Sequence, residues 1–162
     1  MGLEYGVRII PEIDIPAHSL AFAHYKPEIA SRKYGMDHLD LYKKETYQFV
    51  DSLLDEYLSG DNPVFIGDLH IGTDEYNKKE AEQYRYFTDR YLKFVEKYGK
   101  NVRMWGGLKW LPGKTPVKAE GVTVNAWSYD WVDPVVSLQD GYKLINTCDT
   151  YLYICLLYTS DA

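Results

Sequence analysis

Cysteine is scarce in this chain of 162 residues, which contains only Cys148 and Cys155. Two cysteines give no disulfide framework, and their spacing matches no metal-binding motif. No apolar run approaches the roughly 18 residues that a membrane-spanning helix needs. The sequence therefore predicts no disulfide-stabilised fold and no cysteine metal centre, and we expect no membrane segment in it.

Basic residues are also in the minority, since 18 Lys and Arg stand against 24 Asp and Glu and the net charge is −6. No basic patch is present to neutralise phosphates, so we expect no nucleic-acid partner. Met1 leads directly into residues 2–6 (GLEYG), which do not resemble a signal peptide, and the compartment is left open. Hydrophobic residues make up 46% of the chain, which excludes a disordered protein.

Strand-like and helix-like segments alternate along the chain. Strand patterns occur at residues 7–13, 64–70, 102–106, 122–127 and 143–147. Apolar residues at helical spacing lie between them, at residues 45–58, 79–98 and 134–139. This alternation predicts an α/β fold with parallel strands, of the βα-barrel kind. A complete barrel needs about 250 residues, so we expect an incomplete one in a single domain.

Two adjacent acids, Asp74 and Glu75, follow the second strand pattern. On a regular strand, neighbouring side chains point to opposite faces. Gly72 lets the backbone turn, so both carboxyl groups can approach one cavity. Close carboxyl groups separate into an acid and an anion, which is the combination that glycoside cleavage uses. The ordinary alternative is a helix start, where acids favour the positive end of the dipole.

Two sequence motifs make a helix start the less favoured interpretation of Asp74 and Glu75. They are residues 11–18 (PEIDIPAH) and residues 70–75 (HIGTDE). Glu75 stands 57 positions after His18. Both motifs, in this order and at this spacing, closely resemble the β-N-acetylhexosaminidases of glycoside hydrolase family 20. Residues 72–76 most resemble the branch that holds lacto-N-biosidases and surface hexosaminidases of gut and mucosal bacteria.

The resemblance extends over residues 1–154 and implies part of a catalytic (β/α)8 TIM barrel, about strands three to seven. Residues 155–162 (CLLYTSDA) fit nothing in the family and resemble the translated read-through of a sequencing adapter. We therefore expect a partial gene product with a non-native tail. Since strands that supply further sugar contacts are missing, we expect the isolated chain to be poorly soluble and inactive.

The family resemblance implies hydrolysis of β-linked N-acetylhexosaminides in which the substrate's own acetamido oxygen is the nucleophile. Glu75 matches the general acid and base, and Asp74 matches the residue that orients the acetamido group. His18 matches the motif histidine that tunes the acid. The implied partner is an oligosaccharide or glycoconjugate with an N-acetylhexosamine, without cofactor or metal ion.

Aromatic residues are assigned by the same resemblance. Trp105 and Trp127 match tryptophans around the N-acetyl group, and Tyr151 matches a tyrosine that donates to its carbonyl. Tyr153 stands where exo-acting members have an aspartate, which favours release of a larger unit such as a disaccharide. Trp110 and Trp131 have no such match, so core or rim positions are expected for them.

Other roles stay open at this stage. We expect His70 to make a structural hydrogen bond, and Glu12 and Asp14 to hold the loop after the first strand. One alternative function is a barrel remnant that binds N-acetylated glycans without cleaving them. Another is a metal-dependent hydrolase that uses the residues His18, His70, Asp74 and Glu75, although no His-Glu-x-x-His motif is present.

Overall fold

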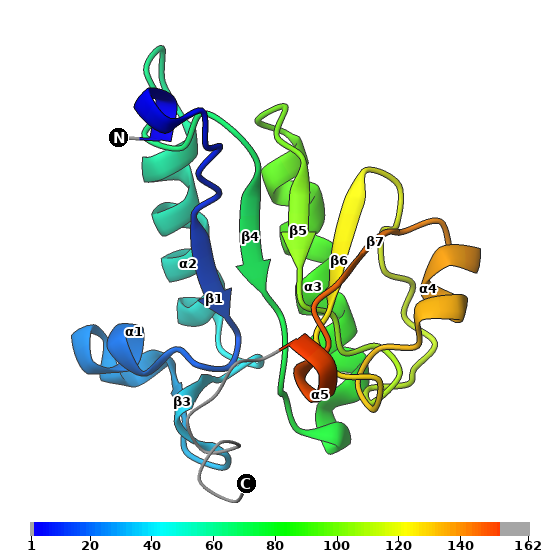
Figure 1. The fold of residues 1–162 in the computed structure, drawn as a ribbon. Coiled ribbons are helices and arrows are strands. Elements are labelled where there is room, and N and C mark those ends of the chain that lie inside the picture. Colours follow the sequence, from blue (N-terminus) through cyan, green and yellow to red (C-terminus); the bar gives the residue numbers. More distant parts are fainter. Residues whose placement is uncertain (1, 153–162) are drawn as a thin grey trace, which may run out of the picture.

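The computed structural model describes residues 2–152 and contains a five-stranded sheet with helices packed on it (Figure 1). The strand order is β1-β4-β5-β6-β7, and every neighbouring pair is parallel. The strands are β1 (Glu12–Ile15), β4 (Leu69–Gly72), β5 (Val102–Met104), β6 (Val122–Ala126) and β7 (Lys143–Asn146). This is an incomplete α/β barrel, as the sequence predicted.

The two long helices follow the predicted apolar spacing. They are α2 (Lys44–Leu58) and α3 (Ala81–Glu96), and both lie behind the sheet in Figure 1. The predicted apolar positions of α3 are all fully buried: Tyr84, Phe87, Tyr91, Leu92 and Val95. The short helix α4 (Pro134–Gln139) begins after Asp133, whose carboxylate accepts hydrogen bonds from the N–H groups of Val135 and Val136.

Small elements that the sequence did not indicate complete the fold. Between β1 and α2 lie α1 (Leu20–Tyr25), the 3-10 turn η2 (Pro27–Ile29) and a hairpin of β2 (Ala30–Ser31) and β3 (Gly35–Leu39). The others are η1 (Gly2–Tyr5), η3 (Lys78–Glu80) and α5 (Asp149–Leu152). They are too short to show a hydrophobic period. No helix in the described chain is long and apolar enough to cross a membrane.

Two strand predictions were wrong in extent, since β1 starts at Glu12 rather than residue 7 and β4 starts at Leu69 rather than residue 64. Val64 and Ile66 are 67% and 77% exposed and do not begin a buried strand. Residues 7–11 and 64–67 line one open apolar groove beside β1. An apolar run becomes a strand only with a partner, and within residues 2–152 the outer side of β1 has none.

Both edges of the sheet are therefore open in the described chain. β1 pairs only with β4, and β7 pairs only with β6. In a closed barrel every strand has two neighbours, which removes such edges. Exposed apolar side chains gather along the β1 edge, at Val7, Ile9, Val64 and Ile66.

A buried carboxylate ties the hairpin to the start of α3. Glu80 accepts hydrogen bonds from Lys33 Nζ at 2.8 Å, from Tyr34 Oη at 2.5 Å and from Tyr42 Oη at 2.6 Å. These hydrogen bonds, with that of Lys33 the largest, lower the pKa of Glu80 to about 2. The network therefore holds the segment that follows Asp74 and Glu75.

We predict that Glu80→Gln lowers the free energy of unfolding at neutral pH by about 1–3 kcal/mol, because three hydrogen-bond donors lose their buried, charged acceptor. The lowered pKa means that the native state binds fewer protons than the unfolded state between about pH 4.5 and about pH 2. The stabilisation is thus present above this window and lost as the pH falls through it.

Urea unfolding of both proteins across this pH range measures the difference. The control is Glu96→Gln, which breaks the pair of Glu96 with Lys118, whose charged atoms lie 2.7 Å apart, at a half-exposed carboxylate. We expect it to change stability by at most about 0.5 kcal/mol. Equal effects of the two substitutions would contradict a structural role for the Glu80 network.

Candidate active site

A cavity of about 480 Å³ lies at the carboxyl ends of four neighbouring strands. Its volume falls in the range of about 300–1,000 Å³ that small-molecule sites occupy. The strands β1, β4, β5 and β6 each contribute to its wall, and the carboxyl end is where barrel enzymes place their active sites. The lining residues are Glu12, Asp14, His18, Asp74, Trp105 and Trp127.

The turn after β4 directs Asp74 into this cavity. Gly72 has φ +68° and Thr73 has φ +67°, so the backbone leaves the strand through the left-handed region. The Thr73 N–H donates to Ile15 O at 3.0 Å, which anchors the turn to β1. The turn that Gly72 was predicted to permit is therefore present. Glu75 also has a positive φ, of 34°, which is uncommon for a residue with a side chain.

His18 brings the two adjacent acids together. Its Nε2 atom lies 3.4 Å from Asp74 Oδ2 and 3.0 Å from Glu75 Oε2. The Asp74 side chain is 15% exposed, whereas that of Glu75 is 46% exposed. One imidazole thus contacts a sheltered carboxyl group and an accessible one.

Asp14 provides a further carboxyl group, which forms a side-chain hydrogen bond with Asp74. Burial, together with the charge of Asp74, raises the pKa of Asp14 well above its ordinary value. Burial also raises the pKa of Asp74, while the charge of His18 and the hydrogen bond from Asp14 oppose that rise. The contact between the two carboxyl groups thus raises the pKa of Asp14 and lowers that of Asp74, while burial raises both.

Glu12 holds one wall of the cavity. Its Oε1 atom accepts a hydrogen bond from Trp105 Nε1 at 2.6 Å and lies 3.1 Å from His70 Nδ1. The His70 ring is buried and packs 4.8 Å from the Trp105 ring. Burial alone would raise the pKa of Glu12, but hydrogen bonds to His70 and Trp105 lower it below the ordinary value. His70 thus makes structural contacts beneath the cavity.

The remaining predicted aromatics differ in position. Trp127 lines the cavity, and its Nε1 donates to Gly106 O at 3.2 Å. Tyr151 lies on α5, is 73% exposed and packs 6.3 Å from the Tyr129 ring, away from the cavity lining. Tyr153 lies outside the described residues.

The whole chain was compared with known proteins. The model of the glycosyl hydrolase family 20 catalytic domain matches residues 1–161. The chain belongs to glycosyl hydrolase family 20.

Individual relatives agree with this assignment. The chain is 29% identical to a beta-hexosaminidase of Arthroderma benhamiae, over 95% of this chain and 31% of that protein. It is 27% identical to a lacto-N-biosidase of Bifidobacterium bifidum, over 88% of this chain and 15% of that protein. A mutant beta-hexosaminidase of Streptomyces plicatus in complex with its product GlcNAc superposes with a TM-score of 0.69 at 26% identity, over 88% and 30% of the two chains. The chain thus spans about a third or less of the length of these relatives.

The sequence left open whether Glu12 and Asp14 contact a ligand, and both line the cavity of this family 20 chain. The sequence feature that points to this position is the alternation of polar and apolar residues in residues 11–16 (PEIDIP). Side chains two apart on a strand share a face, so Glu12 and Asp14 point to one side. Ile13 and Ile15 between them are buried in the core. The alternation indicates a polar face on β1, but it does not indicate that Asp14 on this face contacts Asp74.

One group of side chains in the cavity could hold a metal ion. One ligand atom from each of Asp14, His18 and Asp74 lies within 4.8 Å of the others. His70, which the metal-dependent alternative also used, contacts Glu12 instead. The cluster shares His18 and Asp74 with the acid site, so a metal ion and the acid function would compete for the same atoms.

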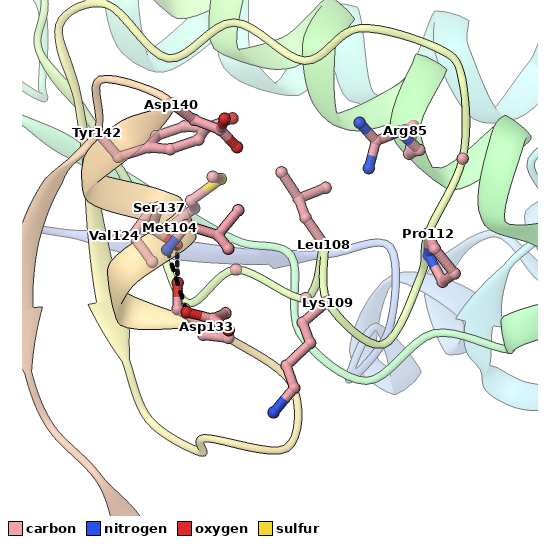
Figure 2. Close-up of a pocket in the computed structure, with 15 residues that line it drawn as sticks. Arg85, Met104, Leu108, Lys109, Pro112, Val124, Asp133, Ser137, Asp140 and Tyr142 are labelled. Carbon is pink, nitrogen blue, oxygen red and sulfur yellow. Dashed lines mark hydrogen bonds between the residues drawn. The ribbon is translucent and has the colours of Figure 1, made fainter.

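A second cavity, of about 350 Å³, contains none of the predicted site residues (Figure 2). It lies where the β5–β6 connection passes over the sheet without forming a helix. Figure 2 shows the charged side chains of Arg85, Lys109 and Asp140 around it, together with the apolar side chains of Met104 and Val124. We assign it no part in the candidate active site.

We predict that Gly72→Ala is far more destabilising than Gly99→Ala. The two glycines have φ +68° and +69°, so the backbone strain of an alanine is matched. A Cβ at Gly72 would lie 1.7 Å from Asp14 Oδ1 and 2.7 Å from Asp14 Cα, while one at Gly99 meets no atom within 4 Å. We expect an additional loss of about 1–3 kcal/mol at Gly72, measured by urea unfolding. Equal losses would show that β1 and β4 need not approach so closely.

We also predict that Asp14→Asn changes how stability depends on pH. Because the native pKa of Asp14 is raised, the native state binds more protons than the unfolded state above about pH 4. Stability is therefore highest below this pH and falls as the pH rises, a decline that asparagine removes while keeping a donor for Asp74. Unfolding curves between about pH 4 and pH 8 measure the slope. Asp61→Asn, in the exposed loop after α2, should leave the slope unchanged.

Proposed function

We propose that this chain provides the acid and acetamido-orienting part of a glycosidase that hydrolyses β-linked N-acetylhexosaminides with retention of configuration. The observation that carries the proposal is the contact of His18 with both Asp74 and Glu75 at the edge of a cavity walled by tryptophans. Family membership supports the reaction class. The beta-hexosaminidase and lacto-N-biosidase relatives suggest the sugars.

Asp74 would bind the N–H of the substrate's 2-acetamido group. The charge of His18 and the hydrogen bond with Asp14 both favour the charged form of Asp74 that this contact needs. The contact turns the acetamido carbonyl oxygen toward C1 of the sugar. An attached and aligned nucleophile removes much of the entropic part of the barrier. The charge of Asp74 also offsets the positive charge that develops as the bond at C1 breaks.

Glu75 would act as the general acid and then as the general base. It gives its proton to the glycosidic oxygen while the acetamido oxygen forms a bond to C1, so the leaving group departs as an alcohol and an oxazolinium remains. Water then attacks C1, Glu75 takes back a proton, and the acetamido group is restored. The accessibility of Glu75 suits this role, since both the leaving group and water must reach it.

Trp105 and Trp127 would enclose the acetamido methyl group. Both line the cavity, and hydrogen bonds from their indole N–H groups to Glu12 and to Gly106 O fix the two rings. An apolar wall favours N-acetylated sugars over sugars that lack the acetyl group and keeps water from the intermediate. Tyr151, which lies on α5 outside the cavity lining in this structure, is still proposed as a donor to the acetamido carbonyl on the basis of the family resemblance alone.

The preference between single sugars and disaccharides is proposed to depend on Tyr153. A tyrosine cannot accept hydrogen bonds from sugar hydroxyls as a carboxylate does. Release of a lacto-N-biose unit is therefore proposed alongside release of terminal GlcNAc or GalNAc. Comparison of aryl lacto-N-biose with aryl GlcNAc as substrates measures this preference, and equal rates on both would remove the role assigned to Tyr153.

We predict that Glu75→Gln and Asp74→Asn each lower kcat/KM on the preferred aryl glycoside by about 10²- to 10⁴-fold. The assay uses the 162-residue chain beside any longer polypeptide from the same gene, and we expect the 162-residue chain to be inactive because both sheet edges are open within residues 2–152. Asp61→Asn is the matched control at an exposed acid. A thiazoline mimic of the oxazolinium should inhibit the wild type.

Two other outcomes identify the alternatives. Binding of N-acetylated glycans without any cleavage by the longer polypeptide would favour a barrel remnant that only binds. Loss of activity with a chelator, restored by a divalent cation, would favour a metal-dependent hydrolase at the Asp14, His18 and Asp74 cluster. Insensitivity to the chelator, together with loss of activity in both variants, supports the proposed mechanism.

A further inference from the structure

A row of three tryptophans leads away from the candidate active site. Trp127 lines the catalytic cavity, and its ring centroid lies 5.6 Å from that of Trp131. Trp131 lies in turn 5.1 Å from Trp110. Successive ring planes are inclined by 33° and 36°, so neighbouring rings pack against each other in one contiguous aromatic row.

The far end of this row borders a separate groove of about 550 Å³. Trp131 and Trp110 form one side, and residues 76–79, directly after Glu75, form the other. Trp110 is 39% exposed, although a tryptophan usually buries most of its large apolar ring. The groove therefore lies next to the acid that would protonate the leaving group.

Polar groups accompany the two rings. Lys78 Nζ lies 4.7 Å from the centre of the Trp110 ring, and Lys79 and Asn77 also line the groove. Sugars present apolar ring faces that stack on indoles, and hydroxyl oxygens that accept hydrogen bonds from ammonium and amide groups. The combination of indole faces with donors at the rim suits a saccharide better than an apolar ligand.

We propose that the Trp131–Trp110 groove binds the leaving-group part of the substrate, as one or more sugar residues of a β-linked oligosaccharide that continue beyond the scissile bond. The inference rests on the proposed function, because it takes Glu75 as the acid at the junction of the two sites. It adds a binding surface and a preference for oligosaccharide over aryl leaving groups. Trp110 and Trp131 are thereby binding residues, and not only core or rim positions.

The test compares binding of GlcNAc and chitotriose, the β-linked GlcNAc trimer, by calorimetry and by NMR of the indole N–H signals of the four tryptophans. We expect the trimer to bind about ten-fold more tightly than the monomer. The Trp105 and Trp127 signals should shift with both sugars, whereas the Trp110 and Trp131 signals should shift with the trimer only. Trp110→Ala should abolish the trimer preference and leave GlcNAc affinity unchanged.

Controls separate the two proposals. Trp110→Phe keeps an aromatic face and should retain most of the preference, and Tyr25→Ala removes another strongly exposed aromatic, on α1, and should change nothing. GlcNAc binding without trimer preference, or a preference that survives Trp110→Ala, overturns the groove while leaving the proposed function intact. Failure of both sugars to bind overturns the groove and the sugar site together.

Discussion

The close approach of β1 to β4 is the constraint on which the site depends. Gly72 leaves no room for a side chain, since a Cβ there would overlap the Asp14 carboxylate. The absence of that one carbon lets Asp14 and Asp74 share a hydrogen bond across two strands that are far apart in the sequence. The same left-handed turn places Glu75 beside His18. Backbone packing therefore sets the distances between the carboxyl groups.

Sequence reasoning succeeded where the signal is local. The 3.6-residue spacing of large apolar residues predicted α2 and α3. The predicted face of α3 is fully buried, whereas in α2 Val50 and Leu54 are buried and the other predicted positions are only partly buried. The motifs at residues 11–18 and 70–75 predicted which side chains meet at the strand ends, because parallel strands bring their carboxyl ends to one edge. Asp74, His18, Trp105 and Trp127 all line one cavity.

Sequence reasoning failed where the structure of a segment depends on contacts with residues that are distant in the sequence. Residues 7–11 and 64–67 have strand-like composition, but β1 pairs only from Glu12 onward and its outer side is open in the described chain. The raised pKa values of Asp14 and Asp74 are also invisible in sequence, because they arise from burial and from a contact across strands. The position of Trp110 beside the loop after Glu75 depends on the path of a connection without regular structure.

The different exposure of the Asp74 and Glu75 side chains explains how one site could serve the two steps of the proposed reaction. Asp74 is sheltered and lies beside Asp14, whose pKa is raised, an arrangement that would suit a fixed contact to a group held inside the cavity. Glu75 is 46% exposed and is not among the residues that line the cavity, so the leaving group and the water of the proposed reaction could reach it. His18 contacts both acids, so a shift of its ring would disturb both carboxyl groups, and with them the proposed acetamido contact and proton transfer. Adjacent residues thus obtain opposite environments because the positive φ values after β4 send one side chain inward and leave the other at the surface.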